Sequence, residues 1–178
     1  MNYTSILLAL FEFVLTGSLA LLVVYMTYRL FAVTSPDYDP EVELKKGNLG
    51  AGILLAALIV SAGLIVREGI YPTINLVRLY FTSPDSYLTG PQVLALAFGH
   101  LGLVFVVAVY SMSWSLRFWG RLTTRIDEGE ELKRGNAAVG IVLAGVVAVM
   151  AIFMSDAISR LTKAMIPQPS LGHVEIMR

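Results

Sequence analysis

Residues 39–58 read DPEVELKKGNLGAGILLAAL, and residues 127–146 read DEGEELKRGNAAVGIVLAGV. The two stretches align without a gap at an offset of 88 residues, and about half of their positions carry the same residue. Self-similarity at a fixed spacing indicates an internal duplication. Each copy passes from a charged segment through Gly-Asn into a long apolar run. The pattern therefore predicts an elbow that turns the chain into a membrane-spanning helix.

The apolar runs around these elbows decide the fold class. The chain has 178 residues, of which 56% are hydrophobic, and a mean hydropathy of +0.72, which is typical of membrane proteins. A bilayer core about 30 Å thick needs roughly 20 apolar residues in a helix. Four runs meet that length, at about 5–31, 48–66, 92–118 and 136–158. We therefore expect an all-α integral membrane protein with four transmembrane helices.

Two helices in each copy return the chain to the side of the membrane from which it started. The two hairpins, over residues 1–68 and 92–158, should therefore be parallel and related by a pseudo-twofold axis along the membrane normal. Residues 69–91 are expected to form an external amphipathic connection, in which an interfacial helix begins at Pro72. A continuation of the second helix past the membrane is the alternative. Residues 159–178 are expected to form an external tail.

The formal net charge is zero, so the chain has no overall positive charge that would attract nucleic acid. The positions of the charged residues nevertheless predict the orientation of the helices in the membrane. More Lys and Arg residues lie near the two hairpin loops than at the opposite ends of the helices. The positive-inside rule then places both loops in the cytoplasm and both termini outside. The basic residues on the loop side are Arg29, Lys45, Lys46, Arg117, Arg121, Arg125, Lys133 and Arg134.

The residues of each elbow have a physical use. Gly47 and Gly135 permit the backbone turn that points the next helix into the membrane. Asn48 and Asn136 can accept hydrogen bonds from the free N–H groups of its first turn. Small residues then follow at intervals of four and predict a close helix contact, although a binding role for the Asn and Lys side chains stays open. These stripes are Asn48, Gly52 and Ala56 in one copy and Asn136, Gly140 and Ala144 in the other.

The duplicated junction resembles a known family. An acidic residue followed by Leu-Lys-Lys/Arg-Gly-Asn-x-x-x-Gly-Ile occurs at 43–53 and again at 131–141. This pattern is similar to that of the bacterial domain-of-unknown-function 350 family of small inner-membrane proteins, and the resemblance covers nearly the whole chain. It implies four helices in two repeats in the bacterial inner membrane. It brings no activity and no catalytic residue.

Four ionisable residues inside or beside the spans need a reason, because each is costly in hydrocarbon. The offset of 88 residues aligns Glu12 with His100, and Glu68 with Asp156 at the outer ends of the second and fourth helices. One interpretation is a Glu12–His100 pair that fixes helix register. The alternatives are a titrating pair that relays protons, and a mixed metal site with Glu68 or Asp156.

The expected function is non-enzymatic, because the sequence shows no nucleophile with a base and no phosphate-binding loop. With no Cys and one His inside the spans, iron–sulfur ligation and bis-His haem within one chain are excluded, and no cofactor or metal is expected. We expect a small membrane subunit or scaffold that packs in the bilayer with itself, as a homo-oligomer, or with a larger inner-membrane complex. A proton- or ion-conducting oligomer that uses Glu12 and His100 is the alternative.

Overall fold

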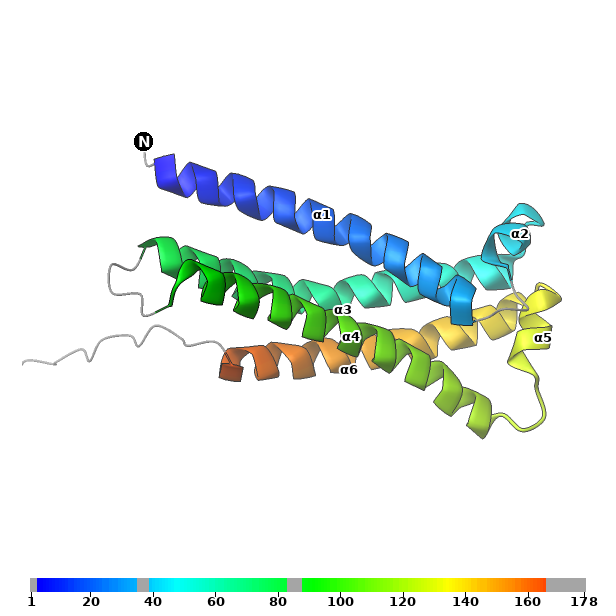
Figure 1. The fold of residues 1–178 in the computed structure, drawn as a ribbon. Coiled ribbons are helices and arrows are strands. Elements are labelled where there is room, and N and C mark those ends of the chain that lie inside the picture. Colours follow the sequence, from blue (N-terminus) through cyan, green and yellow to red (C-terminus); the bar gives the residue numbers. More distant parts are fainter. Residues whose placement is uncertain (1–2, 35–38, 83–87, 166–178) are drawn as a thin grey trace, which may run out of the picture.

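The computed structural model describes residues 3–34, 39–82 and 88–165, which form six helices (Figure 1). Four are long, and the short helices α2 and α5 lie together at one end of the bundle, which we call the elbow end. The opposite end is called the far end. α1 and α4 run toward the elbow end, whereas α3 and α6 run away from it. The helices are α1 (Tyr3–Thr34), α2 (Pro40–Lys45), α3 (Leu49–Thr82), α4 (Gly90–Leu122), α5 (Glu128–Lys133) and α6 (Ala137–Met165).

The four long helices are long and apolar enough to cross a membrane, so the predicted fold class is confirmed. Each is longer than the predicted span. At 1.5 Å per residue, α3 with its 34 residues is about 51 Å long, whereas the hydrocarbon core is about 30 Å thick. The helices are therefore longer than an untilted crossing of the hydrocarbon requires.

The predicted connection over residues 69–91 is wrong in its first half. α3 continues without a break through Pro72 to Thr82, so the alternative of a continued second helix is correct and the separate interfacial helix is not. Pro72 offers no N–H to the carbonyl of Glu68, and in the same turn the buried Thr73 hydroxyl donates to the carbonyl of Gly69 at 2.8 Å. Residues 159–165 of the predicted tail likewise belong to α6, and residues 166–178 lie outside the described residues.

The core forms where α3 packs against α6 and α4. The buried side chains of α4 recur every three or four residues, from Val93 through Ala97 to Val104 and Ala108. Small residues are frequent on these faces because helices in lipid associate through close packing and not through exclusion of water. The tightest approach is at the elbow end, where the backbones of α3 and α6 meet at Gly50 and Gly140.

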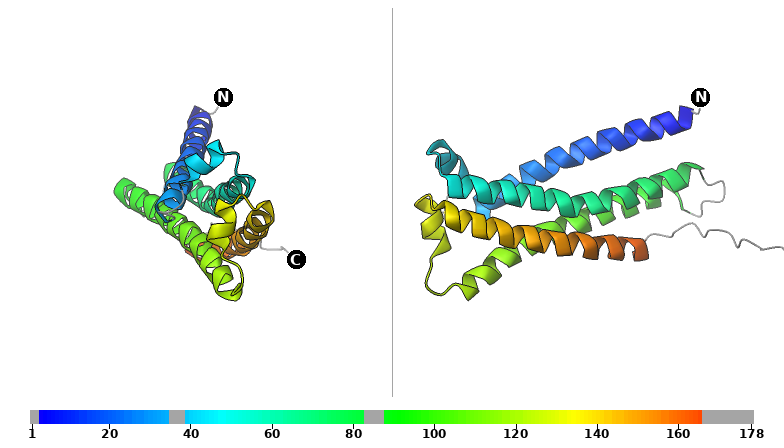
Figure 2. Two further views of the ribbon diagram at one scale, coloured as in Figure 1. Left: turned by 90° about the vertical axis from the view of Figure 1, so that its right-hand side faces the viewer. Right: turned by 180° about the vertical axis from the view of Figure 1, so that it is seen from behind.

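α1 lies at the edge of this bundle and packs chiefly against α3. Its buried side chains are Val23, Thr27 and Phe31, all in the half that approaches the elbow end. Toward its N-terminus α1 diverges from α3, and both views from the side show it standing apart (Figures 1 and 2).

Candidate functional site

The two elbows have the same backbone geometry. Each ends its short helix with a glycine in the left-handed region, Gly47 at φ +75° and Gly135 at φ +79°. In the first elbow, the N–H of Gly47 bonds to the carbonyl of Leu44 and the N–H of Asn48 bonds to the carbonyl of Glu43, both at 3.0 Å. The second elbow repeats both bonds at the matching positions. This pair of bonds is the Schellman motif, which closes a helix with glycine.

Each elbow asparagine begins the following helix and is tied to its own elbow. Asn48 Oδ1 accepts from the N–H of Ala51 at 3.0 Å, while Asn48 Nδ2 donates to the Glu43 carboxylate at 2.8 Å. Asn136 donates to Glu131 in the same way, at 2.7 Å. The glutamate thus locks the amide in the orientation that caps the helix.

Glu43 is buried although it is charged, and two donors compensate for the lost water. Lys46 Nζ lies 2.8 Å from one carboxylate oxygen and Asn48 Nδ2 lies 2.8 Å from the other. The hydrogen bond from Lys46, and then that from Asn48, holds the pKa of the Glu43 carboxyl below its usual value. Glu43 therefore stays ionised at neutral pH and binds both partners as a carboxylate.

The first elbow makes one bond that the second lacks. Asn48 Nδ2 also donates to the carbonyl of Leu132 in the second elbow, at 2.6 Å. Asn48 is buried as a result, whereas Asn136 is only half-buried. The two copies of one motif therefore have unequal surroundings.

The predicted small-residue stripes are only partly at the contact between α3 and α6. A Cβ added to Gly140 would lie 2.5 Å from the carbonyl oxygen of Gly50, so the two backbones touch here. The glycine on α3 is Gly50 and not the predicted Gly52, whose added Cβ would meet only the Leu44 side chain of its own elbow. Ala56 is exposed and Ala144 is half-buried. In the stripe on α3, Asn48 contacts the second elbow, whereas Gly52 and Ala56 lie away from the close contact.

The structure does not pair Glu12 with His100. The Glu12 carboxylate lies 3.8 Å from Arg78 on α3 and is about half exposed. His100 Nε2 lies instead 3.2 Å from the hydroxyl of Thr162 on α6, and both residues are buried. Glu12 and His100 are each 22 residues from the elbow-end terminus of their helix, about 33 Å, and lie toward the far boundary of the hydrocarbon. Their match in sequence therefore corresponds to equal depth and not to contact.

The outer acids do not complete a metal site. Glu68 binds its neighbour Arg67 at 3.2 Å, and Asp156 is exposed on α6. Within the part of the chain that the structure describes, no three His, Asp or Glu side chains gather closely enough to hold a metal ion.

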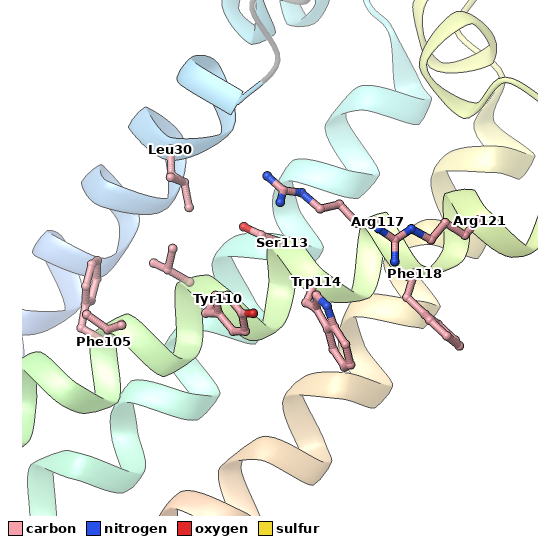
Figure 3. A pocket seen from close by; sticks show the side chains of 10 residues that line it. Leu30, Phe105, Tyr110, Ser113, Trp114, Arg117, Phe118 and Arg121 are labelled. Atoms are coloured by element: carbon pink, nitrogen blue, oxygen red, sulfur yellow. The ribbon is translucent and has the colours of Figure 1, made fainter.

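The elbow-end half of the bundle contains a groove between α1 and α4 that the sequence did not reveal (Figure 3). Its volume is about 520 Å³, and its lining comes mostly from α4, including Tyr110, Trp114 and Phe118, with Leu30 from α1. Two arginines, Arg117 and Arg121, line the same groove. Trp114 alone suggests an aromatic belt at the membrane boundary, which is how the sequence is most simply interpreted. The sequence feature that could have indicated the groove is the spacing of aromatic and basic residues on one face of α4.

A second cavity of about 200 Å³ adjoins the groove, with Leu30, Ser113 and Arg117 lining both. It lies between α1, α3 and α4, where Leu58 and Met112 form part of its wall. Thr27 of α1 also lines it, and the Thr27 hydroxyl is buried without a hydrogen-bond partner. A buried hydroxyl without a hydrogen-bond partner is unfavourable by roughly 1–3 kcal/mol. A ligand in this cavity that accepts a hydrogen bond from Thr27 would remove that cost.

A family model described as Domain of Unknown Function (DUF350) matches residues 92–174. The matched segment contains α4 from its third residue onward, the second elbow and α6. The resemblance expected over nearly the whole chain is thus found in the second hairpin. No curated protein and no solved structure matches the chain.

Proposed function

We propose that this chain, which belongs to the DUF350 family through its residues 92–174, is a non-enzymatic membrane subunit that functions in an assembly. The assembly is formed with further copies of the chain or with a larger complex of the bacterial inner membrane. The elbows lie on the cytoplasmic side in this proposal, because the basic residues gather there. The family description carries no activity, so the proposal rests on the surface of the molecule.

The observation that carries this proposal is the exposure of α1. From Ser5 to Leu22, every described side chain of α1 is exposed or only half-buried. A Cβ added to Gly17 would meet no atom within 4 Å. The far-end half of α1 is therefore exposed around most of its circumference, apart from the half-buried stripe of Leu8, Glu12, Leu15 and Leu19.

Apolar side chains on such a surface can face lipid, whereas the Glu12 carboxylate, toward the far boundary of the hydrocarbon, is costly wherever it faces acyl chains. Arg78 covers it from one side only, at 3.8 Å, and both side chains stay about half exposed. Thr16, Gly17 and Ala20 lie exposed along the same helix, and small residues let a second helix approach closely. A partner helix on this surface would bury Glu12 and Arg78 together.

Conduction of ions through a Glu12–His100 pair receives no support from this arrangement. The two side chains have different partners on different helices, and His100 is enclosed between α4 and α6. The assembly proposal requires no such pair.

Native mass spectrometry of the protein, extracted gently from its own membrane, tests the proposal. We expect a homo-oligomer or a complex with other proteins, and we expect Gly17→Leu to dissociate it. Gly145→Leu is the matched control, because Gly145 is also exposed on a long helix with no atom within 4 Å of an added Cβ. A monomer without partners, or equal dissociation by both substitutions, would contradict the proposal.

A further inference from the structure

The groove between α1 and α4 combines an apolar wall with positive charge at one end. Tyr110, Trp114 and Phe118 supply aromatic surface, and Arg117 and Arg121 follow one turn apart near the end of α4 (Figure 3). Among the residues that the structure describes, no ion pair includes either arginine. Two guanidinium groups without carboxylate partners beside a groove attract an anion.

The dimensions of the groove correspond to one leaflet of a bilayer. Its lining on α4 runs from Phe105 to Arg121, a rise of 16 residues or about 24 Å. One leaflet contributes about 15 Å of hydrocarbon, and the headgroup layer adds several more. With Arg121 one residue from the end of α4, the arginines and Phe118 lie at headgroup depth, and Trp114 and Tyr110 follow one and two turns deeper, beside acyl chains.

The adjoining cavity adds a polar group at intermediate depth. The Thr27 hydroxyl is buried and unpaired, and it lines this cavity together with Arg117. A purely apolar occupant would leave the hydroxyl unpaired, whereas an ester carbonyl would accept its hydrogen bond. Phospholipids carry their ester groups next to the phosphate, and Thr27 lines the same cavity as Arg117.

We propose that this groove binds an anionic phospholipid of the elbow-end leaflet, with the headgroup phosphate at Arg117 and Arg121 and an acyl chain along the aromatic wall. The Thr27 hydroxyl donates to an ester oxygen of the same lipid. This site is independent of the α1 surface proposed above for assembly, which lies toward the far end.

Lipid titration followed by native mass spectrometry tests this site on the full chain in detergent. The probes are phosphatidylglycerol, which is anionic, and phosphatidylcholine with the same acyl chains, which has no net charge. We expect tighter binding of phosphatidylglycerol, and about 30-fold weaker binding of it after Arg117→Gln and Arg121→Gln together. The control is the double substitution Arg29→Gln and Arg125→Gln, which removes two exposed charges of the loop side that do not line the groove. It should change the affinity by less than about threefold.

Two further variants separate the groove from charge alone. Val106→Trp, at an exposed position of the groove wall, fills the apolar part and should reduce the binding of both lipids. Thr27→Val keeps the volume of the side chain and removes the unpaired hydroxyl, so the protein should fold normally while phosphatidylglycerol binds about 2- to 10-fold more weakly.

Three results would overturn the proposal. The first is equal affinity for both lipids, and the second is an equal loss of affinity in the arginine pair and in its control. The third is a homodimer that excludes lipid and in which Val106→Trp breaks the dimer, because the groove would then hold a second copy of the chain.

Discussion

Replacing Gly140 by Ala should destabilise the bundle at its tightest contact. The added Cβ would lie 2.5 Å from the Gly50 carbonyl oxygen and 2.6 Å from the Gly50 Cα. Both are backbone atoms, so no side-chain rotation can relieve the overlap. Ordinary contact would require α6 to move away from α3 by about 1 Å, which loosens the largest helix contact in the structure.

The magnitude follows from a comparison with Gly145→Ala on the same helix. Both substitutions gain the same helix propensity, up to about 1 kcal/mol, but an added Cβ at Gly145 meets no atom within 4 Å. The difference between them is then the overpacking cost, about 1–3 kcal/mol. At about 2–4 °C per kcal/mol for a chain of this size, Gly140→Ala should melt about 2–12 °C below Gly145→Ala.

Thermal unfolding in detergent, followed by intrinsic Trp fluorescence, measures this gap. Gly52→Ala is a second control, because Gly52 matches Gly140 in sequence and its added Cβ would meet only the flexible Leu44 side chain, at 3.6 Å. It should behave like Gly145→Ala. Equal melting temperatures for the variants at 140 and 145 would refute the close α3–α6 contact. A larger loss at 52 than at 140 would favour the contact that the sequence predicts.

Three other predictions concern the elbows and the far end. Asn48→Ala should lower the free energy of unfolding by about 0.5–1.5 kcal/mol more than Asn136→Ala, because only Asn48 donates to the other elbow; equal losses in denaturant titrations would count against that bond. Because the folded pKa of Glu43 is lowered, its contribution is fully present above its ordinary value of 4.5 and is lost as the pH falls through the folded pKa. Melting temperatures between pH 3 and 7 should thus depend less on pH in Glu43→Gln, and an unchanged profile would contradict this. The changes in the free energy of unfolding caused by Glu12→Gln and His100→Ala should add within about 0.5 kcal/mol in a double-mutant cycle. A larger coupling energy would indicate that the two side chains interact after all.

The sequence was sufficient to predict the four long helices and both elbows, because these depend on local patterns. A helix end needs only a glycine that adopts positive φ and an asparagine that can cap the next turn, and both Gly47-Asn48 and Gly135-Asn136 have this geometry in the structure. The continuation of α3 was harder to predict, since Pro72 suits a first turn as well as a kink. Only packing against α4, for example of Gly69 against Val104, decides between a new helix that begins at Pro72 and a continuous α3.

Partners across helices could not be predicted, because they depend on how each helix is rotated about its axis. Alignment at 88 residues places Glu12 and His100 at equal depth but does not tell which neighbour each side chain faces. The same limitation applies to the groove between α1 and α4. Its lining comes from two helices about 80 residues apart in sequence, and no motif connects Leu30 with Trp114.

One residue explains why the two similar elbows have different neighbours. In a contact with exact twofold symmetry, the approach of Gly50 to Gly140 would be repeated by Ala138 and Gly52, which occupy the matching positions. A Cβ at Gly50 would lie 2.7 Å from the carbonyl oxygen of Asn136, so the approach is possible only where no Cβ exists. Ala138 carries that Cβ, and its side of α6 stays exposed. A single methyl group thus favours a one-sided contact and leaves the second elbow asparagine without a partner from the first elbow.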